Sequence, residues 1–190
     1  MVNKKHIFTN SAGETFELFP LNPLEEQEIR IQIENDWKAA GKALPEAPFY
    51  EALNGAGEKF KIQLAKAEDA DTPELKAAWD AYKAAETEIN SEYSDRFLVA
   101  CFAAVNADPD DYPAWKMRMK MRKIAIPEDD ADKQILFGKT WVIRSSDDIA
   151  SLIVACTRTM TNMSEEAAQA AEAMFRGKVA QAAAGLTQSD

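Results

Sequence analysis

The side chains that most often carry out chemistry are scarce in this sequence. Its one histidine is His6, and its two cysteines, Cys101 and Cys156, lie far apart. A serine or cysteine nucleophile needs a histidine beside it, and zinc sites draw on clustered cysteine and histidine ligands. We therefore expect no such catalytic site, no metal and no cofactor. Both cysteines lie in apolar stretches, which predicts buried thiols rather than a disulfide.

Two short segments resemble parts of nucleotide-binding motifs, but neither motif is complete. Gly55, Ala56 and Gly57 begin like a dinucleotide fingerprint, whose third glycine is replaced here by Phe60. The run from Gly138 to Thr140 ends like a phosphate loop, but Lys133 stands where the first glycine of that motif belongs. An enzyme built on this sequence would have to rely on carboxylates alone. The sequence therefore favours a protein without enzymatic activity.

The most unusual stretch for binding spans residues 115–124. It holds three of the seven methionines and five basic residues of an otherwise acidic chain. Pliable thioethers rimmed by cations suit a surface that receives an apolar partner segment. The sequence thus predicts a protein-binding site made of Trp115, Met117, Met119, Met121 and Ile124. The alternative is an ordinary core face with solvated charges, and a second candidate is a strand edge that accepts an added peptide strand.

Composition narrows the class of partner. The 190 residues, 46% of them hydrophobic, suffice for one domain or for one domain with a small appendage. The formal charge of -10 repels phosphate backbones and anionic lipid headgroups, which argues against nucleic acid and membrane partners. No apolar run reaches the roughly 20 residues needed to span a bilayer, and no secretory signal is apparent. We expect a cytoplasmic protein.

The first part of the sequence predicts two hairpins and one helix. Residues 7–19 alternate around a turn at 10–13, and Asn22 and Pro23 begin a helix that Gly41 ends. Prolines at 45 and 48 indicate an extended connector. Residues 49–53 and 58–64 flank a glycine turn and predict a second hairpin, with Phe60, Ile62 and Leu64 on one buried face. The competing prediction is a helix over 58–68.

The remainder of the sequence predicts helices. Thr72 caps a helix that extends to about residue 106 and buries Trp79, and a second helix runs through Trp115 to Ile124. A short helix over 128–137 is expected to stop at Gly138, and residues 139–144 to form a strand or an extended connector. Helices starting at Ser146 and Ser164 follow.

These elements predict a mainly α (α+β) fold. It comprises five or six helices and a small N-terminal antiparallel β region of one or two hairpins. The expected domains are residues 1–68, with the hairpins and one helix, and residues 69–185, which are helical. Residues 186–190 are expected to form a flexible tail.

The order of these features resembles the tail assembly chaperones of long-tailed bacteriophages. The resemblance is carried by residues 8–19, 37–42, 48–50, the glycine turn, 72–82 and 110–115. It is a pattern of spacing and composition without a diagnostic motif, and it covers roughly two thirds of the chain. Residues 116–124 and the last two predicted helices fall outside the resemblance.

Membership of that family would imply a protein that is absent from the finished virion. It would bind the tape measure protein, recruit tail tube subunits and act in the host cytoplasm without a cofactor. The family has no catalytic motif, so no site residue is carried over from it. The alternatives are a structural neck or tail component of the virion and another oligomeric scaffold, and the sequence leaves a homo-oligomer open.

Overall fold

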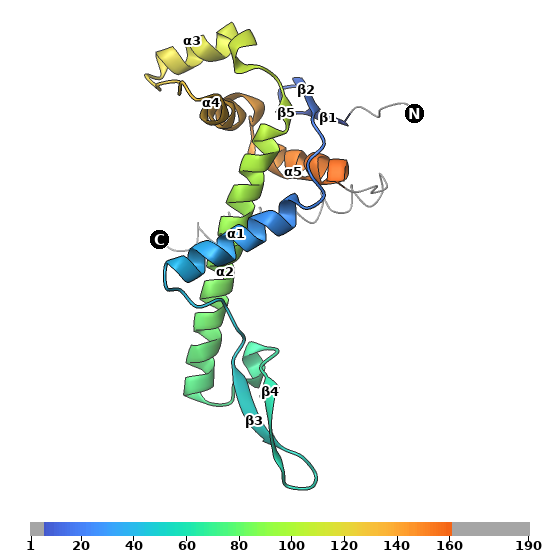
Figure 1. Ribbon diagram of the computed structural model, residues 1–190, viewed down its shortest axis with the longest axis vertical. Coiled ribbons are helices and arrows are strands. Elements are labelled where there is room, and N and C mark those ends of the chain that lie inside the picture. Colours follow the sequence, from blue (N-terminus) through green and yellow to red (C-terminus); the bar gives the residue numbers. More distant parts are fainter. Residues whose placement is uncertain (1–5, 161–190) are drawn as a thin grey trace. The chain divides into compact units, whose positions relative to one another are not determined.

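The computed structural model describes residues 6–160 and confirms a mainly α (α+β) fold (Figure 1). The α-helices of this part are α1 (Glu25–Ala39), α2 (Pro73–Ala103), α3 (Pro113–Met121), α4 (Asp130–Phe137) and α5 (Ser146–Met160). The strands are β1 (His6–Thr9), β2 (Thr15–Leu18), β3 (Phe49–Leu53), β4 (Lys59–Gln63) and β5 (Val105–Asn106). The helix predicted from Ser164 and the predicted tail lie outside the described residues.

The described chain divides into two compact units. Unit 1 contains residues 6–26 and 96–160, and unit 2 contains residues 27–95. The boundary expected at residue 68 falls inside unit 2. Unit 1 contains both the first hairpin and the C-terminal helices because β2 of the hairpin pairs with β5. These two strands are far apart in the sequence, so local sequence patterns do not reveal their pairing.

The sheet of unit 1 has the strand order β1-β2-β5 and is antiparallel throughout. The first hairpin is confirmed, with Phe8 opposite Phe16. Its turn forms because the Asn10 side-chain oxygen accepts hydrogen bonds from the backbone N–H groups of Ala12 (3.0 Å) and Glu14 (2.9 Å). Gly13 supplies the positive φ of 81° that the turn requires. β5 was not predicted.

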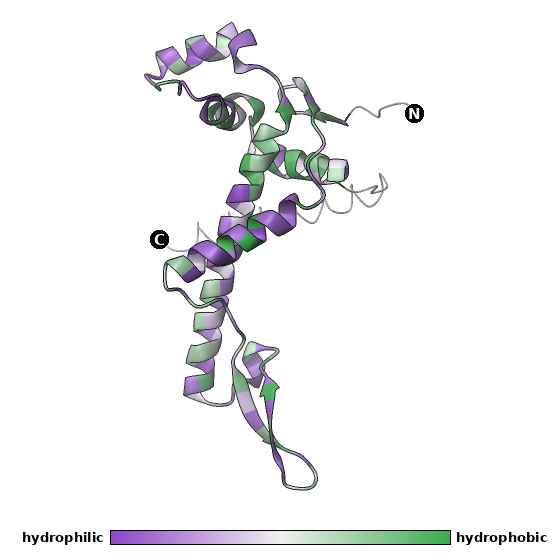
Figure 2. Ribbon diagram, in the orientation of Figure 1, coloured by the Kyte–Doolittle hydropathy of each residue, from purple (hydrophilic) through white to green (hydrophobic). Residues whose placement is uncertain are grey.

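The core of unit 1 combines aromatic rings with aliphatic side chains. Figure 2 shows hydrophobic residues concentrated on the C-terminal part of α2 and on α5. The largest fully buried side chains of this unit include Trp115, Phe102 and Phe137. Cys101 and Cys156 are both buried and unbridged, as predicted. The Cys101 thiol has a raised pKa because it hydrogen-bonds with Cys156 and is buried, which suits an inert core thiol.

Two predictions for residues 138–144 are wrong. Gly138 does not end a helix, because its φ of -52° and ψ of -54° are helical and α4 continues directly into a π-helical segment, Gly138–Val142. That segment occupies most of the stretch expected to be extended, and extended backbone returns only at Ile143. The glycine is needed for a different reason, because an added Cβ at this position would lie 2.4 Å from the ring of Phe102.

In unit 2, α1 buries Ile29, Ile33 and Trp37 on one face. The helix ends as predicted at Gly41, which has a φ of 71°. Its N–H donates to the carbonyl of Lys38 (3.1 Å), and the N–H of Lys42 donates to the carbonyl of Trp37 (2.9 Å). This pair of bonds is a Schellman motif, in which glycine tolerates the left-handed residue after the helix.

The second hairpin of unit 2, β3 with β4, is also confirmed, but its burial differs from the prediction. Leu64 is buried and Ile62 is half-buried, whereas Phe60 is 45% exposed. A two-stranded sheet offers little cover for its faces, so alternation along one strand does not ensure burial. Trp79 on α2 is likewise only half-buried rather than in a core. The cap at Thr72 is confirmed, since its hydroxyl accepts from the Leu75 N–H (3.2 Å).

Candidate protein-binding surface

The predicted binding residues lie on two opposite faces of α3 and the turn that follows it. Trp115 and Met119, one helical turn apart, are both 0% exposed. Met117 and Met121 are 65% and 78% exposed, and Ile124 is 37% exposed. Placing Trp115 and Met119 in the binding site is therefore wrong, because both are enclosed in the core of unit 1. The surface available to a partner consists of Met117, Met121 and Ile124.

The buried face of α3 is held by Trp115. Its ring packs edge-on against Phe137, with centroids 5.3 Å apart and an interplanar angle of 87°. Its indole N–H donates to the Thr140 hydroxyl oxygen (2.9 Å), and that hydroxyl donates to the carbonyl of Leu136 (2.6 Å). A large apolar ring whose polar atom is also satisfied makes a stable anchor. Trp115 therefore positions the surface rather than forming part of it.

The end of α3 determines where Ile124 lies. Lys123 adopts a positive φ of 56°, the only described non-glycine residue to do so. The N–H of Ile124 donates to the carbonyl of Met119 (3.0 Å), and the N–H of Lys123 donates to that of Lys120 (3.1 Å). This is a second Schellman motif, with lysine in the position that normally takes glycine. It ends the helix at Met121, earlier than predicted, and places Ile124 beside the last turn.

Some of the basic residues of α3 and of the turn that follows it have an acidic partner, and others have none. Lys116 forms an ion pair with Asp110 (2.8 Å), and the hydrogen bond from Lys116 is the main reason that the pKa of Asp110 is lowered. Lys120, Arg122 and Lys123 are exposed, and none of their side chains forms an ion pair within residues 6–160. Three exposed cations without an ion-pair partner in this part of the chain thus lie next to the exposed methionines in the sequence, which makes this surface both apolar and positively charged.

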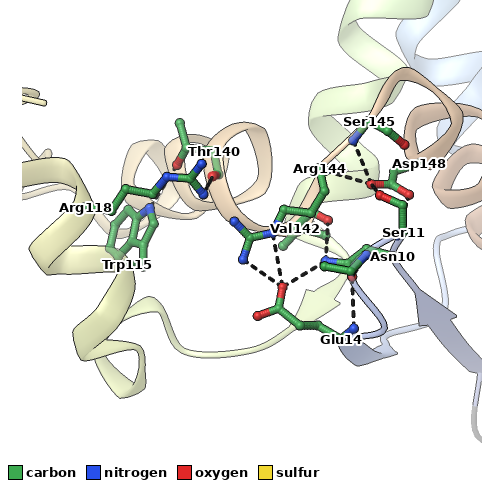
Figure 3. Close-up of polar contacts among 11 residues, drawn as sticks. Asn10, Ser11, Glu14, Trp115, Arg118, Thr140, Val142, Arg144, Ser145 and Asp148 are labelled. Atoms are coloured by element: carbon green, nitrogen blue, oxygen red, sulfur yellow. Dashed lines mark hydrogen bonds and ion pairs between the residues drawn. The ribbon is translucent and has the colours of Figure 1, made fainter.

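A polar network in unit 1 supports the segment that holds α3 (Figure 3). Asp148 is 4% exposed, and its carboxylate accepts hydrogen bonds from the backbone N–H groups of Ser11, Arg144 and Ser145 (2.8, 2.7 and 2.9 Å) and from the Ser11 hydroxyl (3.0 Å). Burial opposes ionisation, but these donors outweigh it, so the pKa of Asp148 is lowered. Two of these donors, the N–H groups of Arg144 and Ser145, lie directly before α5, so the carboxylate caps the start of that helix.

The same network reaches the π-helical segment through Asn10 and Glu14. The Asn10 amide donates to the carbonyl of Val142 (3.1 Å) and to Glu14 (3.0 Å), and Arg144 donates to Glu14 (2.8 Å). Burial would raise the pKa of Glu14, but these donors lower it overall. The network fixes Val142 and hence the segment that presents Thr140 to Trp115. None of these residues was singled out from the sequence, because the contacts join positions more than 100 residues apart.

No protein-family model, curated protein or solved structure matches this chain. Within residues 6–160, no group of three or more histidine, cysteine or acidic side chains is arranged to hold a metal ion. In the same part of the chain, no helix has the length and apolar character to cross a membrane.

The β3–β4 hairpin is the other predicted peptide-binding candidate. Both outer edges lack a strand partner among the described residues, and Phe49, Leu53 and Phe60 are 47%, 66% and 45% exposed. These side chains are divided between the two faces, because Phe60 pairs with Ala52 whereas Phe49 and Leu53 point the other way. The exposed apolar groups of α3 lie beside one another instead, which makes α3 the better candidate.

Proposed function

We propose that this protein acts without catalysis by binding another protein through the solvent-facing side of α3. The observation that supports this most directly is the exposure of Met117 and Met121, at 65% and 78%, on a helix whose opposite face is fully buried. Apolar side chains exposed side by side on a firmly anchored helix are typical of a site that a partner covers.

The expected strength of such a contact can be bounded. Full burial of a methionine or isoleucine side chain contributes about 1.5–3 kcal/mol. Because Met117, Met121 and Ile124 are partly covered already, covering them fully would contribute roughly 3–6 kcal/mol. A Kd of 1 µM corresponds to about 8 kcal/mol. The apolar contact alone is therefore weak and reversible, which suits a protein that engages its partner and then releases it.

The resemblance to phage tail assembly chaperones specifies the partner. On this proposal, the protein binds the tape measure protein in the host cytoplasm, recruits tail tube subunits and leaves before the tail is complete. The support is the order of sequence features in residues 8–19, 37–42, 48–50, the glycine turn, 72–82 and 110–115, together with the exposed apolar surface of α3. A reversible apolar surface suits a protein that shields a long helical partner during assembly.

The test is affinity capture of the tagged, full-length protein from cells that express its genomic neighbours. The proposal predicts recovery of one long, helix-rich protein, and no copies of this chain in purified finished particles by mass spectrometry. Stoichiometric retention in the particles would instead indicate a structural neck or tail component. Recovery of this chain alone would indicate a self-associating scaffold.

A further inference from the structure

The exposed side of α3 also carries information about the chemistry of its partner. We infer that the segment that docks there is an amphipathic helix whose apolar stripe is flanked by acidic side chains. This inference rests on the proposed function, because it specifies the partner of the same surface.

The charge distribution is the first reason. Five of the chain's 22 basic residues lie within residues 116–123, although the whole chain has a formal charge of -10. Lys120, Arg122 and Lys123 are exposed and have no acidic partner within residues 6–160. Unpaired cations around an apolar centre are complemented by carboxylates on the docking segment, and like charges there would be repelled.

The backbone of α3 is the second reason. Because α3 is helical and ends in a Schellman motif, it offers no strand edge to which an extended peptide could add. Met117, Met121 and Ile124 recur at intervals of four and three residues. Met117 and Met121 lie one helical turn apart, and the Schellman motif places Ile124 beside the last turn. The three side chains form a short apolar patch on the convex surface of a helix, against which a partner helix can pack.

Nucleic acid and membrane surfaces fit this chemistry less well. The centre of the surface consists of methionine side chains, which offer no hydrogen-bond donor to a phosphate group. α3 has nine residues, whereas many helices that lie in a membrane interface have about 20–30. The net charge of the chain also opposes approach to anionic lipid.

Two synthetic peptides test the inference directly. They are helical, share the same leucine stripe and differ only in having glutamate or lysine on both sides of it. Binding of each labelled peptide to the full-length protein is measured by fluorescence anisotropy at low and high salt. We expect the glutamate peptide to bind at least ~10-fold more tightly than the lysine peptide, with a preference that shrinks at high salt. Because the protein is acidic overall, non-specific attraction would favour the lysine peptide, so the expected order reports on α3.

A charge-reversed variant supplies the control. Lys120→Glu combined with Lys123→Glu changes two exposed side chains and should invert the preference between the peptides, with an unchanged circular dichroism spectrum. Equal binding of both peptides, tighter binding of the lysine peptide to the wild-type protein, or no binding of either would overturn the inference. So would displacement of the glutamate peptide by phosphatidylserine vesicles, or self-association that requires Met117 and Met121 and blocks the peptide.

The inference and the proposed function can fail separately. Capture of the native partner that depends on Met117 and Met121, without a preference between the peptides, would retain the function and refute the acidic helix. Capture that is unaffected when both methionines are replaced would refute the function of this surface.

Discussion

Replacing Gly138 by alanine distinguishes two roles for this glycine. A Cβ at this position would lie 2.4 Å from both Cγ and Cδ1 of Phe102 and 2.8 Å from its Cβ. Phe102 is 1% exposed, so its ring is enclosed by the core and cannot turn out into solvent without opening it. Because the backbone at Gly138 is helical, alanine would otherwise stabilise the folded state by about 0.5–1 kcal/mol. Whether Gly138→Ala raises or lowers the free energy of unfolding therefore depends on the contact with Phe102.

The expected magnitude follows from these opposing terms. Overpacking of a well-filled core costs about 1–3 kcal/mol, and contacts this short favour the upper end. Subtracting the conformational gain leaves a net loss of roughly 2 kcal/mol in the free energy of unfolding. For a chain of this size, that corresponds to a Tm lower by about 4–8 °C. Thermal and urea unfolding followed by circular dichroism measure both quantities.

Two further variants make the Gly138→Ala result decisive. Gly55→Ala is the matched control and should be nearly neutral, because nothing lies within 4 Å of an added Cβ there. Phe102→Ala removes the Cγ and Cδ1 atoms that the added Cβ would meet, so adding Gly138→Ala to it should cost less than half of what it costs in the wild-type protein. If Gly138→Ala is as stable as the wild type or more stable, the close contact between Gly138 and Phe102 is refuted.

Other substitutions test the support of α3 and the burial of the two tryptophans. Asp148→Asn should lower the free energy of unfolding by roughly 1–3 kcal/mol at pH 7, because the amide cannot accept all the hydrogen bonds that the carboxylate receives. The pKa of Asp148 is lowered in the folded protein, so its contribution to stability is complete above the unfolded pKa of about 4 and is lost as the pH falls through the lower folded value. The difference in urea midpoint between the wild type and the variant should therefore be smaller at pH 3 than at pH 7. Trp115→Ala should cost about 3–5 kcal/mol and Trp79→Ala distinctly less, and equal losses in urea unfolding would contradict the difference in burial. Lys123→Gly should raise Tm or leave it unchanged, since glycine adopts a positive φ at lower cost; a clear drop in Tm would contradict the left-handed backbone there.

Local signals in the sequence predicted the local structure well. Thr72 followed by Pro73 marked the start of α2, and the hydroxyl of Thr72 does cap it. Gly41 marked the end of α1 for the reason expected, since it adopts the left-handed conformation. These predictions succeed because a cap or a turn depends on residues within five positions of one another.

Gly138 shows where this reasoning fails. It follows an apolar helical pattern, as Gly41 does, but its conformation is helical and its role is to admit the ring of Phe102. Both residues are glycines, but Gly41 is required by its own left-handed backbone, whereas Gly138 is required by the ring of Phe102, which lies 36 positions away in the sequence. The pairing of β2 with β5, and the bond from Asn10 to Val142, escaped prediction for the same reason.

The candidate surface was predicted in part. Helical spacing places Trp115 with Met119 and Met117 with Met121, but it does not say which pair faces the core. Methionine occurs on both faces, so the residue types do not indicate which face of α3 is turned toward the core. The fully buried ring of Trp115 and its contact with Phe137 determine the orientation, and only the tertiary structure shows that contact.

The affinity of the captured native partner for two surface variants tests the central proposal most directly. Met117→Glu with Met121→Glu introduces charge only on the exposed side of α3, and Leu53→Glu with Phe60→Glu does the same on the β3–β4 hairpin. Met119 stays unchanged because it is buried. If α3 is the binding surface, the methionine variant should raise the Kd at least ~10-fold, with the hairpin variant unchanged and both folded by circular dichroism. An unchanged Kd for the methionine variant, or a loss of binding confined to the hairpin variant, would contradict it.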